Sequence, residues 1–216
     1  MMKIVCLSAS NIEPARANSA STRTCELIRE MVIAEHNAYV DILCLMDYEM
    51  NSCRMCGKCL EAGKCVRDEA FNQIYQSLAD ADAVFVVCPH YAPLPSKLMM
   101  LLEKLEEICY LNWCRDQKYQ TIVFNKPIGL VAHGGQPTRA ASYYQTSLLD
   151  PLALAFSSIQ MKVVGAAEQS PKGAVFGVKD LRLVPDSIFV EIEHNWEDIR
   201  SRLTPLVKNV MSQIKE

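Results

Sequence analysis

Short apolar runs alternate with helical patterns along this chain, and this alternation restricts its fold more than any other feature. An unbroken apolar run such as residues 4–7 is typical of a strand buried on both faces of a parallel sheet. Further strands are expected at 40–45, 83–88, 126–132 and 160–166. Helical patterns begin near 21 and cover about 68–78, 97–110 and 141–157. The sequence therefore predicts an α/β fold, with a doubly wound five-stranded parallel sheet and helices on both faces.

The C-terminal part departs from this alternation. Residues 169–186 are rich in glycine, proline and charge, which predicts an added loop or small hairpin, and 187–192 is expected to form a further strand. A terminal helix is expected over 195–214. The polar segment 112–125 predicts an irregular excursion, in which 121–124 can be read as a short strand.

Length and charge restrict the class of protein. A chain of 216 residues, half of them hydrophobic, is large enough for one well-buried core, so we expect a single domain over 1–216 with an excursion at 169–192. The formal net charge of -3 argues against a nucleic-acid partner or an anionic membrane surface. The N-terminal apolar run is too short for a signal peptide or a membrane span, so a cytoplasmic protein is expected.

Ten cysteines raise the question of redox compartment. Cys6, Cys44 and Cys88 lie inside apolar runs, where cysteine behaves as a small buried hydrophobe. A reducing compartment fits them better than a secreted disulfide framework does.

Four further cysteines form a compact block at 53–65. Cys53, Cys56 and Cys59 stand three residues apart, and Cys65 follows them. Structural zinc sites usually consist of two C-x2-C pairs with a long spacer, whereas a tight C-x2-C-x2-C run is closer to iron-sulfur ligation. The spacing favours a [4Fe-4S] cluster, with a zinc site and a loop of reduced, unligated thiols as the alternatives.

The loop after the first strand is suited to a phosphate. Residues 9–20 are small and polar, and they lead into a helix, where hydroxyl groups, free N–H groups and the helix dipole favour an anion. The candidate ligands are Arg16, Asn18, Ser19, Ser21 and Thr22. The loop matches neither the Walker pattern nor G-x-G-x-x-G, and an ordinary capped loop is the alternative.

Two other loops follow predicted strands at the carboxyl edge of the sheet, where doubly wound folds bind ligands. Pro89, His90 and Tyr91 follow the third strand. Gly134 and Gly135 follow the fourth, and their lack of side chains would let the backbone approach a flat ligand. For both loops an ordinary turn remains the alternative.

Together, the hydroxyl-rich loop, the cysteine block followed by Asp68, and the Pro89-His90-Tyr91 loop resemble the flavodoxin-like NAD(P)H-dependent FMN reductase superfamily, specifically its iron-sulfur flavoprotein branch. The resemblance covers about residues 1–168. It implies that the FMN phosphate is held by Ser10, Arg16, Asn18, Ser19 and Ser21. It implies that the isoalloxazine is held by Pro89, His90, Tyr91, His133, Gly134 and Gly135. It implies that the cluster is held by Cys53, Cys56, Cys59 and Cys65.

The resulting hypothesis is an FMN-dependent oxidoreductase in which electrons pass between a reduced donor, FMN and a [4Fe-4S] cluster. NAD(P)H is the expected co-substrate, and the acceptor is a small molecule or a protein. No acid or base is assigned, because hydride transfer to a flavin depends on stacking and alignment. A cluster-free FMN, quinone or nitroaromatic reductase is the first alternative, and a non-enzymatic redox carrier or sensor is the second. By analogy with the family, a homodimer or homotetramer is expected.

Overall fold

The computed structural model describes residues 1–12, 19–185 and 190–214. Within these ranges the central sheet has six strands, and every pairing between them is parallel. The strands are β1 (Met2–Ser8), β2 (Ala38–Cys44), β3 (Ala83–Pro89), β4 (Pro127–Pro137), β5 (Lys162–Val164) and β6 (Ala174–Val178). Their order is β2-β1-β3-β4-β5, with β6 also beside β4, which is the flavodoxin-like doubly wound order. The predicted fold is confirmed.

The sixth strand corrects the prediction of a five-stranded sheet, because residues 174–178 were expected to belong to an added loop or small hairpin. β5 pairs with β4 at Pro127–Gly129, whereas β6 pairs with its later part, from Val131 onward. The outer position is thus occupied by two short strands in succession. Gly173 permits the close approach, because a Cβ there would overlap the carbonyl oxygen of Leu130. The approach to β6, with Pro171, Lys172 and Gly173 directly before it, hides its strand pattern from sequence reasoning.

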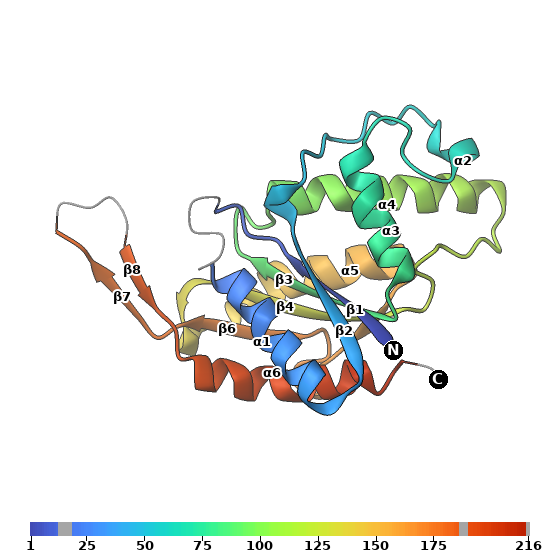
Figure 1. Ribbon diagram of the computed structural model, residues 1–216. Coiled ribbons are helices and arrows are strands. Elements are labelled where there is room, and N and C mark those ends of the chain that lie inside the picture. Colours follow the sequence, from blue (N-terminus) through green and yellow to red (C-terminus); the bar gives the residue numbers. More distant parts are fainter. Residues whose placement is uncertain (13–18, 186–189, 215–216) are drawn as a thin grey trace.

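Helices cover both faces of the sheet (Figure 1). α3 (Glu69–Asp80), α4 (Ser96–Arg115) and α5 (Asp150–Ser158) pack on one face, and α1 (Ala20–Glu35) and α6 (Trp196–Met211) pack on the other. Each face has its own apolar core, because alternate residues of the buried strands point to opposite sides. Val84 and Val86 of β3 belong to the first core, for example, and Phe85 belongs to the second.

Several helix boundaries differ from the prediction. Ser19 caps α1, two residues before the expected Ser21-Thr22 start. The helix expected over 141–157 is interrupted: a π-helical turn, η4 (Gln145–Leu149), precedes α5, which restarts with Pro151 in its first turn. Proline fits the first helical turn because its missing N–H has no partner there. The predicted N-cap Asp68 is confirmed, since its side chain accepts from the N–H of Phe71.

The segment expected to be irregular from residue 112 begins later. α4 continues to Arg115. The polar side chain of Asn112 is accommodated in its last turns, because its amide donates a hydrogen bond to the carbonyl of Ile108. The short strand considered at 121–124 is a turn, closed by the N–H of Phe124 and the carbonyl of Thr121.

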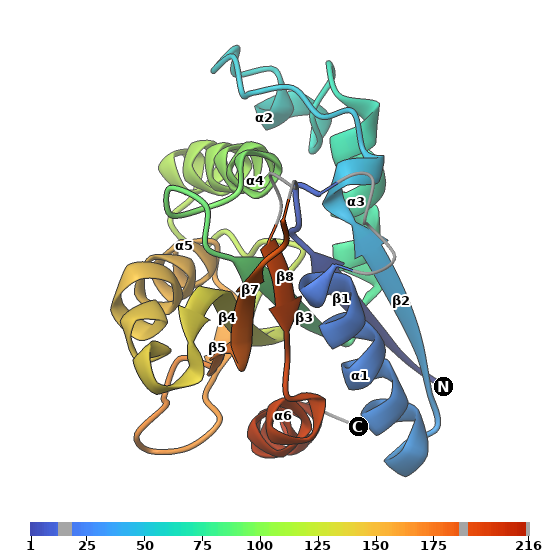
Figure 2. The same cartoon turned by 90° about the vertical axis from the view of Figure 1, so that its left-hand side faces the viewer.

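Two antiparallel strands, β7 (Asp180–Leu183) and β8 (Val190–Glu193), form the predicted C-terminal hairpin. It projects away from the body of the protein (Figure 1 and Figure 2), and the residues of both strands are exposed. In the described ranges, no helix combines the length and the apolar character needed to cross a membrane.

Candidate functional site

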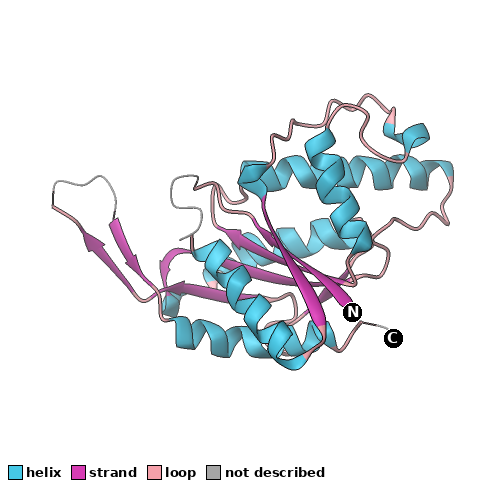
Figure 3. Ribbon diagram, viewed as in Figure 1, coloured by secondary structure: helices cyan, strands magenta, loops and turns pink. Residues whose placement is uncertain are grey.

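The carboxyl edge of the sheet brings the predicted ligand loops together (Figure 3). Parallel register places Ser8 of β1 beside Val87 of β3, and Pro89 of β3 beside His133 of β4. The N–H of His90 also donates to the carbonyl of His133 at 2.8 Å. Backbone pairing therefore fixes the positions of the loops that follow β1 and β3. Residues 133–135, which were expected to follow the fourth strand, lie inside β4, because that strand continues to Pro137.

A buried hydroxyl cluster lies where β1 passes into α1. The Thr22 hydroxyl lies 3.0 Å from that of Ser8 and 2.9 Å from that of Ser19, whose oxygen also accepts from the Thr22 N–H. Ser10, two residues after Ser8, is also buried, and its hydroxyl oxygen accepts from the N–H of Ile12 at 3.2 Å. Hydroxyl groups beside free N–H groups at a helix start are suited to a phosphate.

Two of the predicted phosphate ligands, Arg16 and Asn18, lie outside the described residues. A candidate that sequence reasoning missed is Asn11, whose side-chain oxygen is buried without a hydrogen-bond partner in the described part of the chain. Buried polar atoms usually have partners. Because this oxygen is an acceptor, Asn11 could bond a phosphate only through its NH2 group, and the fit to the phosphate end of an FMN rests on the hydroxyl and N–H groups at the start of α1.

His133 points into the fold and bonds the start of α1. Its Nε2 lies 2.8 Å from the hydroxyl of Ser21, and its ring stacks on Phe176 of β6 at 4.8 Å between centroids. Burial, together with a smaller effect of the neighbouring His194, lowers the pKa of His133 to about 3. At neutral pH the imidazole is uncharged, and it joins β4 to the hydroxyl cluster. Its predicted contact with the isoalloxazine stays a prediction.

Aromatic side chains surround the loop after β3. The ring of His90 lies 5.4 Å from Tyr143 and 5.7 Å from Tyr144, between centroids. Tyr91 is half-buried, and its N–H donates to the carbonyl of Pro93 at 2.7 Å. Tyr143 and Tyr144 precede η4 and carried no signal in the sequence beyond a helical pattern. An exposed Tyr143 beside His90 offers a flat apolar surface at the edge where a flavin ring is expected.

The two glycines of β4 have different surroundings. A Cβ on Gly134 would overlap the ring and hydroxyl of Tyr144, whereas a Cβ on Gly135 would meet nothing within 4 Å. The Tyr144 hydroxyl also accepts from the N–H of Gln136 at 2.8 Å. Gly134 is therefore required for packing, and Gly135 leaves open space at the edge.

All four cysteines of the block line one cavity of about 190 Å³. The block lies between β2 and α3, with Cys59 at the start of the short helix α2 (Cys59–Ala62). Cys56 is exposed and the other three are half-buried. The N–H of Lys58 lowers the pKa of the Cys56 thiol, and burial raises that of Cys59.

In the described part of the chain, the four thiols of this cavity supply the donor type of a cluster but are not arranged around one point. Among the described residues, no three histidine, cysteine or carboxylate side chains are arranged around a point that could hold one metal ion. A cubane spaces its thiolate ligands more widely than one ion does, and four soft thiolates are the donors it requires. The donor set and the shared cavity therefore agree with a cluster.

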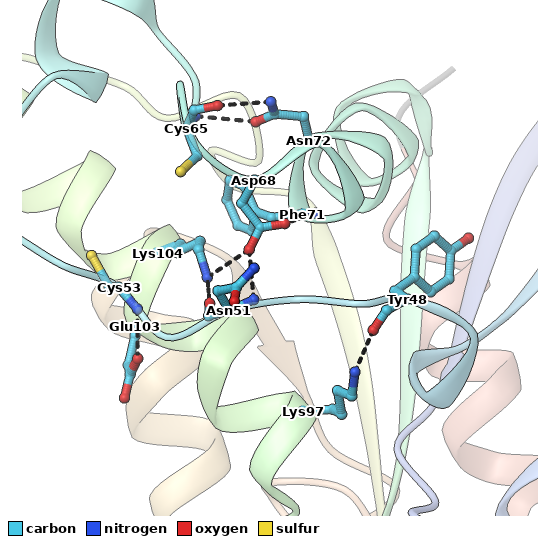
Figure 4. A network of polar contacts seen from close by, with 10 residues as sticks. All are labelled: Tyr48, Asn51, Cys53, Cys65, Asp68, Phe71, Asn72, Lys97, Glu103 and Lys104. Atoms are coloured by element: carbon cyan, nitrogen blue, oxygen red, sulfur yellow. Dashed lines mark hydrogen bonds and ion pairs between the residues drawn. The ribbon is translucent and has the colours of Figure 1, made fainter. Parts of the chain in front are cut away.

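Helices α3 and α4 hold the base of the cysteine block through polar contacts (Figure 4). The ammonium of Lys104 pairs with the carboxylate of Asp68 at 3.1 Å, and the N–H of Asn51 donates to the same carboxylate at 2.8 Å. Burial opposes ionisation of Asp68, but the N–H groups of Phe71 and Asn51 and the Lys104 ammonium hold its pKa below the ordinary value. Sequence reasoning identified the Asp68 cap and missed Lys104.

Comparison with known proteins agrees with this site. Residues 2–170 match the family described as NADPH-dependent FMN reductase. Over 115 residues the chain is 30% identical to the iron-sulfur flavoprotein MJ1083 of Methanocaldococcus jannaschii, an alignment that covers 52% of this chain and 58% of that protein. The chain therefore spans little more than half the length of this relative.

Solved structures show the fold. An oxidoreductase from Corynebacterium diphtheriae is 15% identical with a TM-score of 0.60, covering 99% of this chain and 97% of its own. Oxidised flavodoxin 1 from Bacillus cereus is 12% identical with a TM-score of 0.53, covering 99% of both chains. At these identities the likeness concerns the fold alone.

The fold and the edge loops define a flavodoxin-like flavoprotein. The chain belongs to the NADPH-dependent FMN reductase family, whose pattern covers residues 2–170. The resemblance predicted from the sequence is confirmed.

Proposed function

We propose that this chain is an FMN-dependent oxidoreductase that also carries a [4Fe-4S] cluster and transfers electrons between a reduced nicotinamide donor and a small-molecule or protein acceptor. The ligands of the cluster would be Cys53, Cys56, Cys59 and Cys65. When bound, FMN supplies hydride chemistry and the cluster supplies one-electron transfer.

One observation carries the cluster part of the proposal: all four cysteines of the block line the same cavity. Cys114 is also exposed, but it lies near the end of α4 and does not line this cavity. The iron-sulfur flavoprotein from Methanocaldococcus jannaschii, at 30% identity over part of the chain, supports the same assignment.

The residues of the edge bind and orient the flavin in this proposal. The start of α1 receives the phosphate, and Ser10, Ser19 and Ser21 are the predicted ligands among the described residues. The loop from Pro89 to Tyr91 and the open space at Gly135 receive the ring. No side chain needs to move a proton, because alignment of donor and flavin is sufficient for hydride transfer.

A cluster-free reductase is the second candidate, and the exposure of Cys56 favours it. In that case the block would be a loop of free thiols, and electrons would leave the flavin directly for a soluble acceptor.

Visible spectra of cysteine variants distinguish the two candidates. Cys53→Ser and Cys59→Ser are expected to lose a broad visible absorbance while retaining the FMN bands, because each removes one thiolate from the cavity. Cys114→Ser is the matched control and should leave the spectrum unchanged. Identical spectra for all variants and the wild type would contradict the cluster. Steady NADPH or NADH consumption with a soluble acceptor would be retained in a cluster-free enzyme.

A further inference from the structure

Both ends of the cysteine loop, defined here as residues 52–67, meet at one buried ammonium group (Figure 4). Lys104 of α4 donates to the carbonyl of Asn51, which immediately precedes the loop. The same nitrogen lies 3.1 Å from the carboxylate of Asp68, which immediately follows it. The side chains of Lys104 and Asp68 are only 4% and 2% exposed. Lys104 thus bridges the two ends of the loop, which the Asp68 carboxylate also joins by accepting from the N–H of Asn51.

The remaining contacts of the loop each involve one end. The N–H of Cys53 donates to Glu103 of α4 at 3.1 Å. On the other side, the amide of Asn72 in α3 accepts from the N–H of Cys65 and donates to its carbonyl. The Asp68 carboxylate also joins the two ends directly, because it accepts from the N–H of Asn51. Among the described residues, Lys104 is the side chain from another element that bonds both ends.

Between its two ends the loop follows an irregular path. Met55, Gly57 and Gly63 have φ values of +46°, +69° and +67°, a region that side chains rarely adopt. Every cysteine of the block stands within two residues of one of these three positions, and Cys56 is adjacent to two of them. With few regular hydrogen bonds inside the loop, the positions of its thiols depend strongly on how its base is held.

We propose that Lys104 is the positioning residue of the cysteine cavity. It fixes the two ends of the loop relative to each other, and it places a positive charge in the wall of the cavity beside the negative charge of Asp68. The first role concerns the protein alone. The second rests on the proposed function, because it concerns the charge that a bound cluster would experience.

Other charges also line this cavity, namely Arg54, Arg67 and Glu107. These three side chains stay the same when Lys104 or Asp68 is replaced. A difference in cluster potential between such variants therefore comes from the Lys104–Asp68 pair. Cluster potentials depend on nearby charge and hydrogen bonding. A positive charge favours the reduced form, which carries one more electron, and a negative charge disfavours it.

Hydrogen exchange tests the positioning role without any cofactor. In Lys104→Met, the amides of Asn51, Cys53 and Cys65 are expected to exchange at least about tenfold faster, because a charge-assisted hydrogen bond is lost from the base. Lys126→Met is the matched control: its ammonium donates to the carbonyls of Leu78 and Ala79 at the far end of α3. Equal exchange of the loop amides in Lys104→Met and the wild type would overturn the proposal.

Should Lys104→Met fail to fold, the double variant Lys104→Met with Asp68→Asn keeps the test available. It removes the ammonium that bridges the two ends without leaving a buried carboxylate unpaired, while an amide oxygen at position 68 can still accept from the N–H of Asn51. The same increase in loop exchange is expected, and exchange at the wild-type rate would again overturn the proposal.

The midpoint potential of the iron-sulfur centre distinguishes an effect of the Lys104 charge from a loss of contacts at the base of the loop. Lys104→Met is expected to lower the midpoint potential of the iron-sulfur centre, and Asp68→Asn is expected to raise it, although both weaken the base. Shifts of the same sign in the two variants would overturn the electrostatic role. If the wild type holds no iron, the proposed function fails, and the exchange experiment still decides the positioning role.

Discussion

Burial of His133 makes the free energy of unfolding depend on pH, and the size of this effect follows from its pKa. Because burial lowers its pKa from 6.5 to about 3, the folded protein keeps the imidazole neutral at pH 5, whereas the unfolded chain takes up a proton there. Its contribution to stability is fully present above pH about 6.5 and is lost progressively as the pH falls toward 3. Between pH 7 and pH 5 this linkage lowers the free energy of unfolding by about 2 kcal/mol.

The variant His133→Gln isolates this effect, since glutamine can still bond the Ser21 hydroxyl but does not titrate. Urea unfolding of flavin-free protein at pH 7 and pH 5 gives the loss of stability for each protein. We expect the wild type to lose about 2 kcal/mol more than the variant over this interval. His194, whose pKa burial also lowers, titrates in both proteins and cancels from the comparison. Equal losses would refute the buried, neutral state of His133.

Two further predictions concern the flavin edge. Ser19→Ala removes the N-cap of α1 and is expected to lower the free energy of unfolding in urea by about 1 kcal/mol. Calorimetry should also show weaker FMN binding. An unchanged free energy of unfolding would contradict the role of Ser19 as the cap. Gly134→Ala forces a Cβ into Tyr144 and is expected to cost about 1–3 kcal/mol in the same assay. Gly135→Ala is its control, because the space there is open; equal costs for the two would contradict the packing.

Local sequence patterns were sufficient to predict the buried strands of the sheet and the N-cap of α3. β1 and β3 were predicted because their apolar runs, such as Ile4 to Leu7, are buried on both faces. Asp68 was recognised as an N-cap because that role depends on the next three residues alone. β6 was missed because a strand of five residues after Lys172 and Gly173 has no clear pattern, and its place depends on pairing with β4.

Contacts distant in sequence account for what was missed at the site. The partner of Asp68 stands 36 residues later, in the middle of α4, where Lys104 is part of an ordinary helical pattern. Similarly, the bond between Ser21 and His133 joins residues 112 apart. Only the folded sheet and its helices bring these groups together, so neither spacing nor composition indicates them.

The most direct test of the account is the iron, acid-labile sulfide and flavin content of protein purified without oxygen. We expect about four iron and about four sulfide per chain together with one FMN, the composition of a cubane on four thiolates beside a single flavin. FMN without iron or sulfide would contradict the cluster and leave a flavin reductase with a free-thiol loop.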